Sequence, residues 1–255
     1  MLKKMARRIR NWINQRAAAS IAVEWVKQDS GSRLASLFID STFKTRANSF
    51  SRKIEQRARV TNEKGLQPLW EGYGQDDSRG SNRLPDDVRT DYFMGNLYSE
   101  LVSVTKPATI VEFGTAFGVS GMYFLAGLAH NGRGKLFTFE PNKLWADIAR
   151  QNLSAIGAEF ELVNGTFEDN VKTTLPASQT IDLAFIDAIH TREFVICQLE
   201  IVLTRAAAGA IVILDDINFS DSMKTCWEEV SADPRFVASV KLGNRVGMLE
   251  LHRAP

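Results

Sequence analysis

The sequence has few cysteines and no long apolar run, and each shortage excludes a class of protein. Its 255 residues include two cysteines, Cys197 and Cys226, both in apolar or helical contexts. A disulfide framework or a cysteine-rich metal site is therefore not expected. No segment approaches the ~18 consecutive apolar residues that cross a bilayer. The remaining expectation is a reduced, cytoplasmic protein with a core large enough for one domain and an appendage.

The charge is distributed unevenly, although the net charge is only +1. Residues 1–64 hold 15 Lys/Arg against 5 Asp/Glu, and residues 65–255 hold 16 against 25. Near the start, basic residues separate apolar ones that recur at helical spacing: Leu2, Met5, Ile9, Trp12 and Ile13. This pattern predicts a basic amphipathic helix over residues 1–16. Such a helix suits either an anionic membrane surface, which would place the protein peripherally at the inner membrane, or a sister subunit. We favour the subunit and expect a homo-oligomer, with no nucleic-acid partner.

The chain divides at about residue 90. Residues 65–90 are rich in Gly, Asp, Ser and Arg without periodicity, which is typical of a lid, a binding loop or a linker. We therefore predict a basic, helical N-terminal extension with a loop or lid over 1–90, and one catalytic domain over 91–255.

Strand and helix patterns alternate through the second part. Strands are predicted at 109–113, 135–140, 159–163, 181–187, 210–215, 237–242 and 245–252, with helices between them. This order predicts an α/β, Rossmann-like fold with a mostly parallel seven-stranded sheet and helices on both faces. The last two strands are separated only by Gly243-Asn244, too short for a crossover, so they must form an antiparallel hairpin.

A glycine turn between the first of these strands and a helix carries the strongest functional signal. The segment 111–120 reads VEFGTAFGVS, with Gly114 and Gly118 flanking the turn. A strand, a glycine turn and a helix form a cradle for a nucleotide-type ligand, in which glycine allows the backbone to approach the ligand closely. Glu112 at the strand end would repel a pyrophosphate but suit an ammonium group, which favours S-adenosylmethionine (SAM) over NAD or ATP. The alternative is a purely structural turn.

Glu140 ends the next strand, 26 residues after Gly114. An acidic residue at this point of a βαβ unit can accept hydrogen bonds from both hydroxyls of a ribose. Taken alone, it would be an ordinary surface acid.

Three further acids end later strands. Asp187 follows one strand, and Asp215-Asp216 follows the next. Carboxylates that converge at one sheet edge repel each other, and a divalent cation with oxygen ligands, such as Mg²⁺, would remove that conflict. The alternative is that the three aspartates are structural and bind no metal.

His190 stands three residues beyond Asp187. Imidazole titrates near neutral pH, so His190 is a candidate general base, with Asp187 beside it in the catalytic group. A hydrogen-bonded structural histidine is the competing interpretation.

Residues 94–252 resemble the class I SAM-dependent methyltransferases, especially their metal-dependent O-methyltransferases. The segment 94–97, reading MGNL, and the segment 111–120 are similar to the catechol-type enzymes, although Ala116 replaces their tyrosine. The Asp-x-x-His spacing and the Asp-Asp pair are closer to the macrolide-sugar and aminocoumarin-sugar enzymes. The resemblance implies roles for these residues: Met94, Glu112, Gly114, Gly118, Ser120 and Glu140 in SAM binding, and Asp187, Asp215 and Asp216 in metal binding.

The sequence therefore predicts a SAM-dependent, divalent-metal-assisted O-methyltransferase. Its acceptor would be a hydroxyl of a small molecule or glycan, with a sugar-like acceptor favoured. Two alternatives remain open: a metal-independent N- or O-methyltransferase, and a non-catalytic SAM-binding scaffold.

Overall fold

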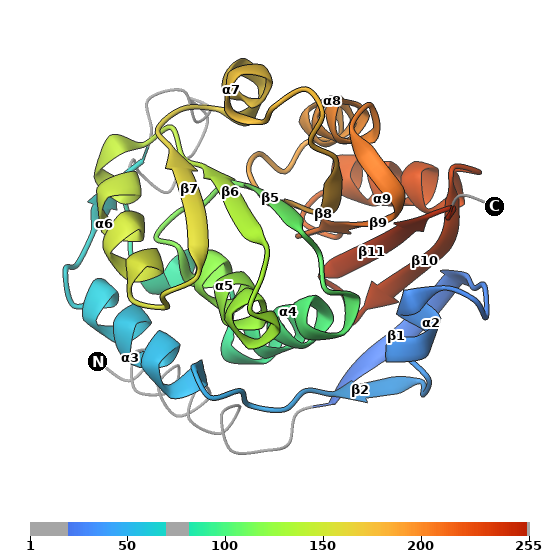
Figure 1. Cartoon of the computed structure of the whole chain (residues 1–255), viewed down its shortest axis with the longest axis horizontal. Coiled ribbons are helices and arrows are strands. Elements are labelled where there is room, and N and C mark those ends of the chain that lie inside the picture. Colours follow the sequence, from blue (N-terminus) through green and yellow to red (C-terminus); the bar gives the residue numbers. More distant parts are fainter. Residues whose placement is uncertain (1–19, 70–81, 254–255) are drawn as a thin grey trace.

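In the computed structural model, strands from both ends of the chain join in one central sheet (Figure 1). The structure describes residues 20–69 and 82–253. The nine strands of this sheet lie in the order β2-β1-β10-β11-β9-β8-β5-β6-β7. Their bounds are β1 Ser20–Lys27, β2 Thr42–Lys44, β5 Thr109–Phe113, β6 Lys135–Phe139, β7 Glu159–Val163, β8 Ile181–Ile186, β9 Ala206–Leu214, β10 Phe236–Leu242 and β11 Val246–Leu251. Strands β3 (Gln67–Pro68) and β4 (Asn82–Arg83) pair separately.

Helices cover both faces of the sheet (Figure 1). One face carries α3 (Ser51–Asn62), α4 (Tyr92–Thr105), α5 (Val119–Asn131) and α6 (Lys143–Ser154), and the other carries α7 (Phe167–Thr174), α8 (Arg192–Leu203) and α9 (Asp221–Ala232). The helix α2 (Arg33–Leu37) and a short 3₁₀ helix (Pro85–Asp87) complete the chain.

Strand β5 shows how the sequence builds the two layers. All five of its residues are buried, as expected for a central parallel strand. Ile110 packs in the core beneath α4 and α5, whereas Val111 and Phe113 pack in the core beneath α7 to α9. Side chains alternate between faces along a strand, so Glu112 points into the first layer, toward α5.

The predicted fold class is confirmed. Strands β5 to β9 are parallel neighbours, and β10 and β11 form the predicted antiparallel hairpin. The sheet differs from the prediction in having nine strands rather than seven. The two extra strands, β1 and β2, lie in the part of the chain that was predicted to be helical. They were missed because β1 pairs with β10, more than 200 residues away in the sequence, and β2 pairs with β1.

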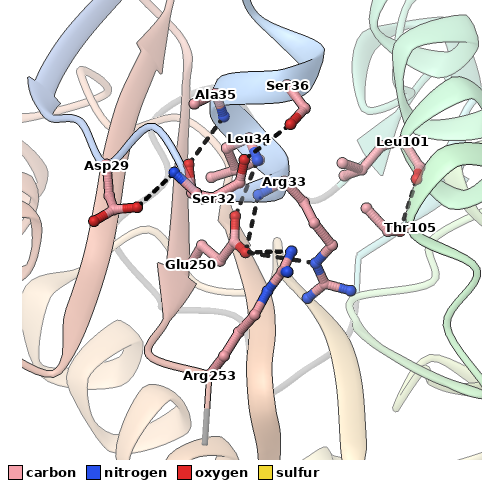
Figure 2. Close-up of polar contacts among 11 residues, drawn as sticks. Asp29, Ser32, Arg33, Leu34, Ala35, Ser36, Leu101, Thr105, Glu250 and Arg253 are labelled. Atoms are coloured by element: carbon pink, nitrogen blue, oxygen red, sulfur yellow. Dashed lines mark hydrogen bonds and ion pairs between the residues drawn. The ribbon is translucent and has the colours of Figure 1, made fainter. Parts of the chain in front are cut away.

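The N-terminal segment is held to the C-terminal strand by a buried carboxylate (Figure 2). Glu250 of β11 accepts hydrogen bonds from the backbone N–H groups of Arg33 (3.1 Å) and Leu34 (2.9 Å), in the first turn of α2. A carboxylate at a helix N-terminus satisfies free N–H groups and the positive end of the helix dipole. The division at residue 90 stays a prediction. Strands β1 and β2 belong to the central sheet, and α2 packs beside it.

The predicted basic helix of residues 1–16 lies outside the described residues. Within 20–69 and 82–253, the structure has no helix with the length and apolar character to cross a membrane.

Candidate active site

A cavity of about 320 Å³ lies at the carboxyl ends of the parallel strands. It opens where the strand order reverses, because β5 has β6 on one side and β8 on the other. In open α/β sheets this switch point is where ligands bind. The lining residues follow β5, β6, β8 and β9, and the N-terminal part adds Leu69, Arg83, Asp87 and Val88.

The glycine turn after β5 forms one wall of the cavity. Gly114 has φ +85°, and a Cβ on it would lie 2.2 Å from the backbone oxygen of Asp187. We predicted a glycine here because the backbone must approach a ligand closely. The structure adds a second reason: any side chain on Gly114 would collide with the backbone of the loop after β8. Gly118, with φ +81°, is the N-cap of α5 and does not line the cavity. It shapes the turn rather than the cavity wall.

Glu140 connects two walls of the cavity. Its Oε2 accepts a hydrogen bond from the backbone N–H of Ala116 (2.8 Å), and its Oε1 accepts one from that of Asn142 (2.8 Å). Ala116 reaches this position with φ +46°, a conformation that is uncommon outside glycine and clusters at functional sites. Burial raises the pKa of Glu140 to about 7. Because a carboxylate has about four acceptor positions, two remain for the ribose hydroxyls predicted to bind here.

Glu112 is fully buried and faces other side chains rather than the cavity. Its carboxylate accepts hydrogen bonds from Ser120 Oγ (2.5 Å) and Thr138 Oγ1 (2.6 Å). Burial raises its pKa to about 7. Ser120 lines a small second cavity beside the glycine turn. Glu112 therefore orients Ser120 toward this small cavity, and the predicted contacts of both residues with the methionine end of SAM stay predictions.

Met94 is a predicted cofactor-binding residue that lies away from the two cavities. It lies in α4, packs in the hydrophobic core, and lines neither of these two cavities. Its predicted part in SAM binding stays a prediction.

The three aspartates and His190 do converge, as predicted. His190 Nε2 lies 3.7 Å from Asp187 Oδ1 and 3.6 Å from Asp216 Oδ2. Asp187, His190 and Asp216 all line the main cavity. Burial lowers the pKa of His190. An imidazole that is neutral near pH 7 can accept a proton.

Arg245, which sequence reasoning missed, also reaches this cluster. Its Nε lies 2.9 Å from Asp215 Oδ1, and its Nη2 lies 2.6 Å from Asp215 Oδ2. The same Nε is 3.1 Å from Asp216 Oδ1. The hairpin carried the signal for this contact: an antiparallel strand beside β9 must begin next to the point where β9 ends, and Gly247 indeed pairs with Leu214. A basic residue at the start of β11 is therefore brought to the aspartates.

The predicted metal site does not fit this arrangement. Asp215 is only 2% exposed, and the Arg245 guanidinium binds both of its carboxylate oxygens. Within the residues that the structure describes, no group of three or more His, Cys, Asp or Glu side chains is arranged to hold a metal ion. We predicted Mg²⁺ at Asp187, Asp215 and Asp216 because a cation would offset their negative charges. The Arg245 guanidinium already supplies part of that positive charge.

The cavity does fit the adenosyl part of SAM. Two buried polar atoms of its lining residues, Trp145 Nε1 and Gln198 Oε1, have no hydrogen-bond partner in the described part of the chain. Buried polar atoms without partners are uncommon, and at a cavity such atoms are available to hydrogen-bond a ligand or water. A donor, an acceptor and the Glu140 carboxylate around one partly apolar cavity suit a nucleoside.

The mouth of the cavity is aromatic. Phe219 lies 5.3 Å from His190 between ring centroids, and Phe194 also lines the cavity. Both phenylalanines are exposed, at 57% and 44%. Exposed aromatic rings beside a base provide a surface on which an acceptor can pack.

Comparison with known proteins agrees with this geometry. A family model described as a methyltransferase domain matches residues 111–217. A protein of Mycobacterium sp. (strain KMS) named "Putative O-methyltransferase" is 34% identical over 125 residues, which cover 47% of this chain and 54% of that protein. The chain thus spans about half the length of the curated relatives it matches.

Solved structures show the same fold. The O-methyltransferase TomG from Streptomyces achromogenes, involved in tomaymycin synthesis and in complex with SAM, superposes with a TM-score of 0.60 at 18% identity, covering 87% of this chain and 94% of that one. An O-methyltransferase from Bacillus cereus in complex with SAH gives a TM-score of 0.58 at 19% identity, covering 86% and 94%. The resemblance drawn from the sequence is confirmed: the chain has the Rossmann-like fold of these SAM- and SAH-bound O-methyltransferases, and residues 111–217 match a methyltransferase domain.

Proposed function

We propose that this protein is a SAM-dependent O-methyltransferase that acts on a hydroxyl of a small molecule or glycan. One observation carries the proposal. A single cavity joins Glu140 and the glycine turn, which suit a nucleoside, to His190 and its two aspartates, which suit proton transfer. The names of the matched relatives and the ligands in the similar structures support the same activity.

The cofactor would lie along the ends of β5 and β6. Glu140 would accept hydrogen bonds from the ribose, Trp145 and Gln198 would contact the adenosyl part, and Ser120 would contact the methionine end. Bound there, SAM would supply an activated methyl group, which an oxygen nucleophile takes as the C–S bond breaks and the neutral thioether S-adenosylhomocysteine leaves.

His190 would act on the acceptor. Its Nε2 faces Asp187 and Asp216, so the positive charge that it gains on accepting the hydroxyl proton is stabilised by two carboxylates. The oxygen freed of its proton would attack the methyl carbon. Much of the rate would come from holding the hydroxyl in line between His190 and the cofactor.

The acceptor would pack on Phe194 and Phe219. Aromatic rings bind both phenols and the apolar faces of sugars, so this surface is compatible with the sugar-like acceptor favoured by the sequence. The metal ion that was also predicted is not needed in this mechanism, because the Arg245 guanidinium already binds both carboxylate oxygens of Asp215.

Methyl transfer from labelled SAM to a panel of sugars and phenols tests the activity. His190→Gln should abolish transfer on whichever acceptor responds, while His130→Gln, an exposed histidine of α5, should leave it unchanged. Calorimetry with SAM and with NAD tests the cofactor separately. Tight NAD binding without SAM binding would refute the proposal, and SAM binding without transfer would favour the scaffold alternative.

A further inference from the structure

We propose that Arg245 is a built-in cation that takes the place of a divalent metal at the ends of β8 and β9, and that methyl transfer by this protein proceeds without a metal ion. The proposal rests on the proposed function only for its catalytic part. Its structural part concerns which cation the aspartates bind. Arg245 is then a positioning residue, acting through Asp215 and Asp216 rather than on the methyl group.

The contact geometry matches a dedicated ion pair. Two nitrogens of the guanidinium meet the two oxygens of Asp215, and Nε also approaches Asp216. Bidentate pairing of this kind fixes the orientation of the carboxylate as well as its charge. The guanidinium also stays protonated in proteins, so its single positive charge offsets part of the negative charge of the aspartates whatever the pH.

Burial explains why the pair would be retained. Asp215 is almost fully buried, whereas Asp216 is 28% and Asp187 18% exposed to the cavity. A buried carboxylate without a partner is strongly unfavourable, so a charged Asp215 is stabilised by a cation that binds it in the folded protein. Arg245 supplies that cation, and the other oxygen of Asp216 still faces His190, as Asp187 does.

The backbone fixes Arg245 in this place. The N–H of Ile217 donates to the carbonyl of Arg245 (2.9 Å), and Asn218 Nδ2 donates to the carbonyl of Asn244 (2.8 Å). Two hydrogen bonds therefore hold the turn of the hairpin to the loop after β9. Since the methyltransferase-domain match ends at residue 217, Arg245 lies outside the matched segment.

Metal binding is the first test and does not depend on an acceptor. Mn²⁺ is added to the full-length wild type and to Arg245→Met, and bound Mn²⁺ is measured by electron paramagnetic resonance. Wild type should leave the Mn²⁺ free at ~0.1 mM, whereas Arg245→Met should bind it at least about tenfold more tightly, because carboxylates are the preferred ligands of such hard cations. Arg235→Met is the matched control, since Arg235 also pairs with carboxylates and is equally exposed, but lies outside the cavity. Wild-type binding, or the absence of binding by a folded Arg245→Met, would overturn the proposal.

Turnover is the second test, on an acceptor that wild type methylates. EDTA should leave the wild-type rate unchanged, and a loss of rate on chelation that Mg²⁺ restores would overturn the proposal. Arg245→Met should lower kcat by about tenfold or more while the Kd for SAM changes less than threefold. Arg245→Lys, which keeps the charge without the fork, should recover part of that loss and covers the case in which Arg245→Met fails to fold. Unchanged kcat in a folded Arg245→Met would also refute the catalytic part. If no acceptor is methylated at all, the proposed function fails, while the Mn²⁺ experiment still decides which cation the aspartates bind.

Discussion

The two halves of the cavity are built in different ways. The cofactor half comes from neighbouring pieces of chain: the glycine turn after β5, Glu140 after β6, and the start of α6. The acceptor half brings together side chains from β8, β9 and the distant β10–β11 hairpin. The first half depends on backbone conformation, and the second depends on charge balance among side chains. Substitutions in the two halves should therefore have different effects on SAM binding, turnover and stability.

The largest expected effect is in the acceptor half. His190→Ala should lower kcat by ~10²–10⁴-fold, the usual contribution of a general base, with SAM affinity nearly unchanged. Single-turnover kinetics with saturating SAM would measure it. A near-normal rate across pH would mean that another group takes the proton.

Gly114 connects the halves, and its replacement should disturb both. In Gly114→Ala the new Cβ would lie 2.2 Å from a backbone oxygen, in addition to the cost of a positive φ. We expect a loss of roughly 3 kcal/mol of unfolding free energy together with weaker SAM binding. Gly132→Ala is the matched control, because Gly132 has φ +67° with open space around it and should cost only about 1 kcal/mol. Equal losses in urea denaturation would show that the contact with the β8 loop is unimportant.

Glu112 tests the buried support beneath the cofactor half. Its pKa is raised to about 7 by burial, so between the ordinary carboxyl pKa and pH 7 the folded state holds more protons than the unfolded state. The stability contributed by this group therefore falls as pH rises through that window.

Glu112→Gln cannot ionise, so it should gain about 2 kcal/mol relative to wild type between pH 5 and pH 7. Glutamine fits the site, because its amide N–H can donate to Thr138 Oγ1 while the Thr138 hydroxyl donates to Thr115 Oγ1. Urea denaturation at several pH values measures the difference. If the unfolding free energies of wild type and Glu112→Gln change with pH in the same way, Glu112 is not the group that takes up the proton.

The smallest expected effect is at the cofactor surface. Glu140→Gln loses the charge and turns an amide NH₂ group toward one of the two backbone N–H groups that donate to Glu140, so it should weaken SAM binding by at least about 1 kcal/mol, roughly fivefold. Glu159→Gln, an exposed residue of β7, is the control for calorimetry. Unchanged affinity would remove Glu140 from the site and with it the main argument for the cofactor half.

Prediction from the sequence was accurate wherever the signal was local. The strand at 109–113, the glycine turn and the antiparallel hairpin each carry their pattern within a few residues, and each was located correctly. The strand predicted at 135–140 ends one residue earlier, and the hairpin loop spans residues 243–245 rather than the predicted Gly243-Asn244, because Leu242 pairs with Val246. The convergence of Asp187, His190 and Asp216 also followed from local reasoning, because parallel strands end at one edge of the sheet.

Three features could not be obtained in this way. Strand β1 was missed because its partner, β10, lies at the other end of the chain. The burial of Glu112 behind Ser120 depends on which face of β5 packs on α5, and the core position of Met94 depends on the packing of α4. A residue's type and spacing do not specify these tertiary neighbours.

By itself, the sequence determined the parallel sheet, the turn that forms the cofactor half and the acidic edge of the acceptor half, because hydrophobic periodicity and glycine placement act over short stretches of chain. Only the tertiary structure decided which cation meets those acids. Arg245 and Asp215 are 30 residues apart and come together through the antiparallel pairing of β11 with β9. Electrostatic partners are chosen by distance in space, and the sequence gives distance only along the chain.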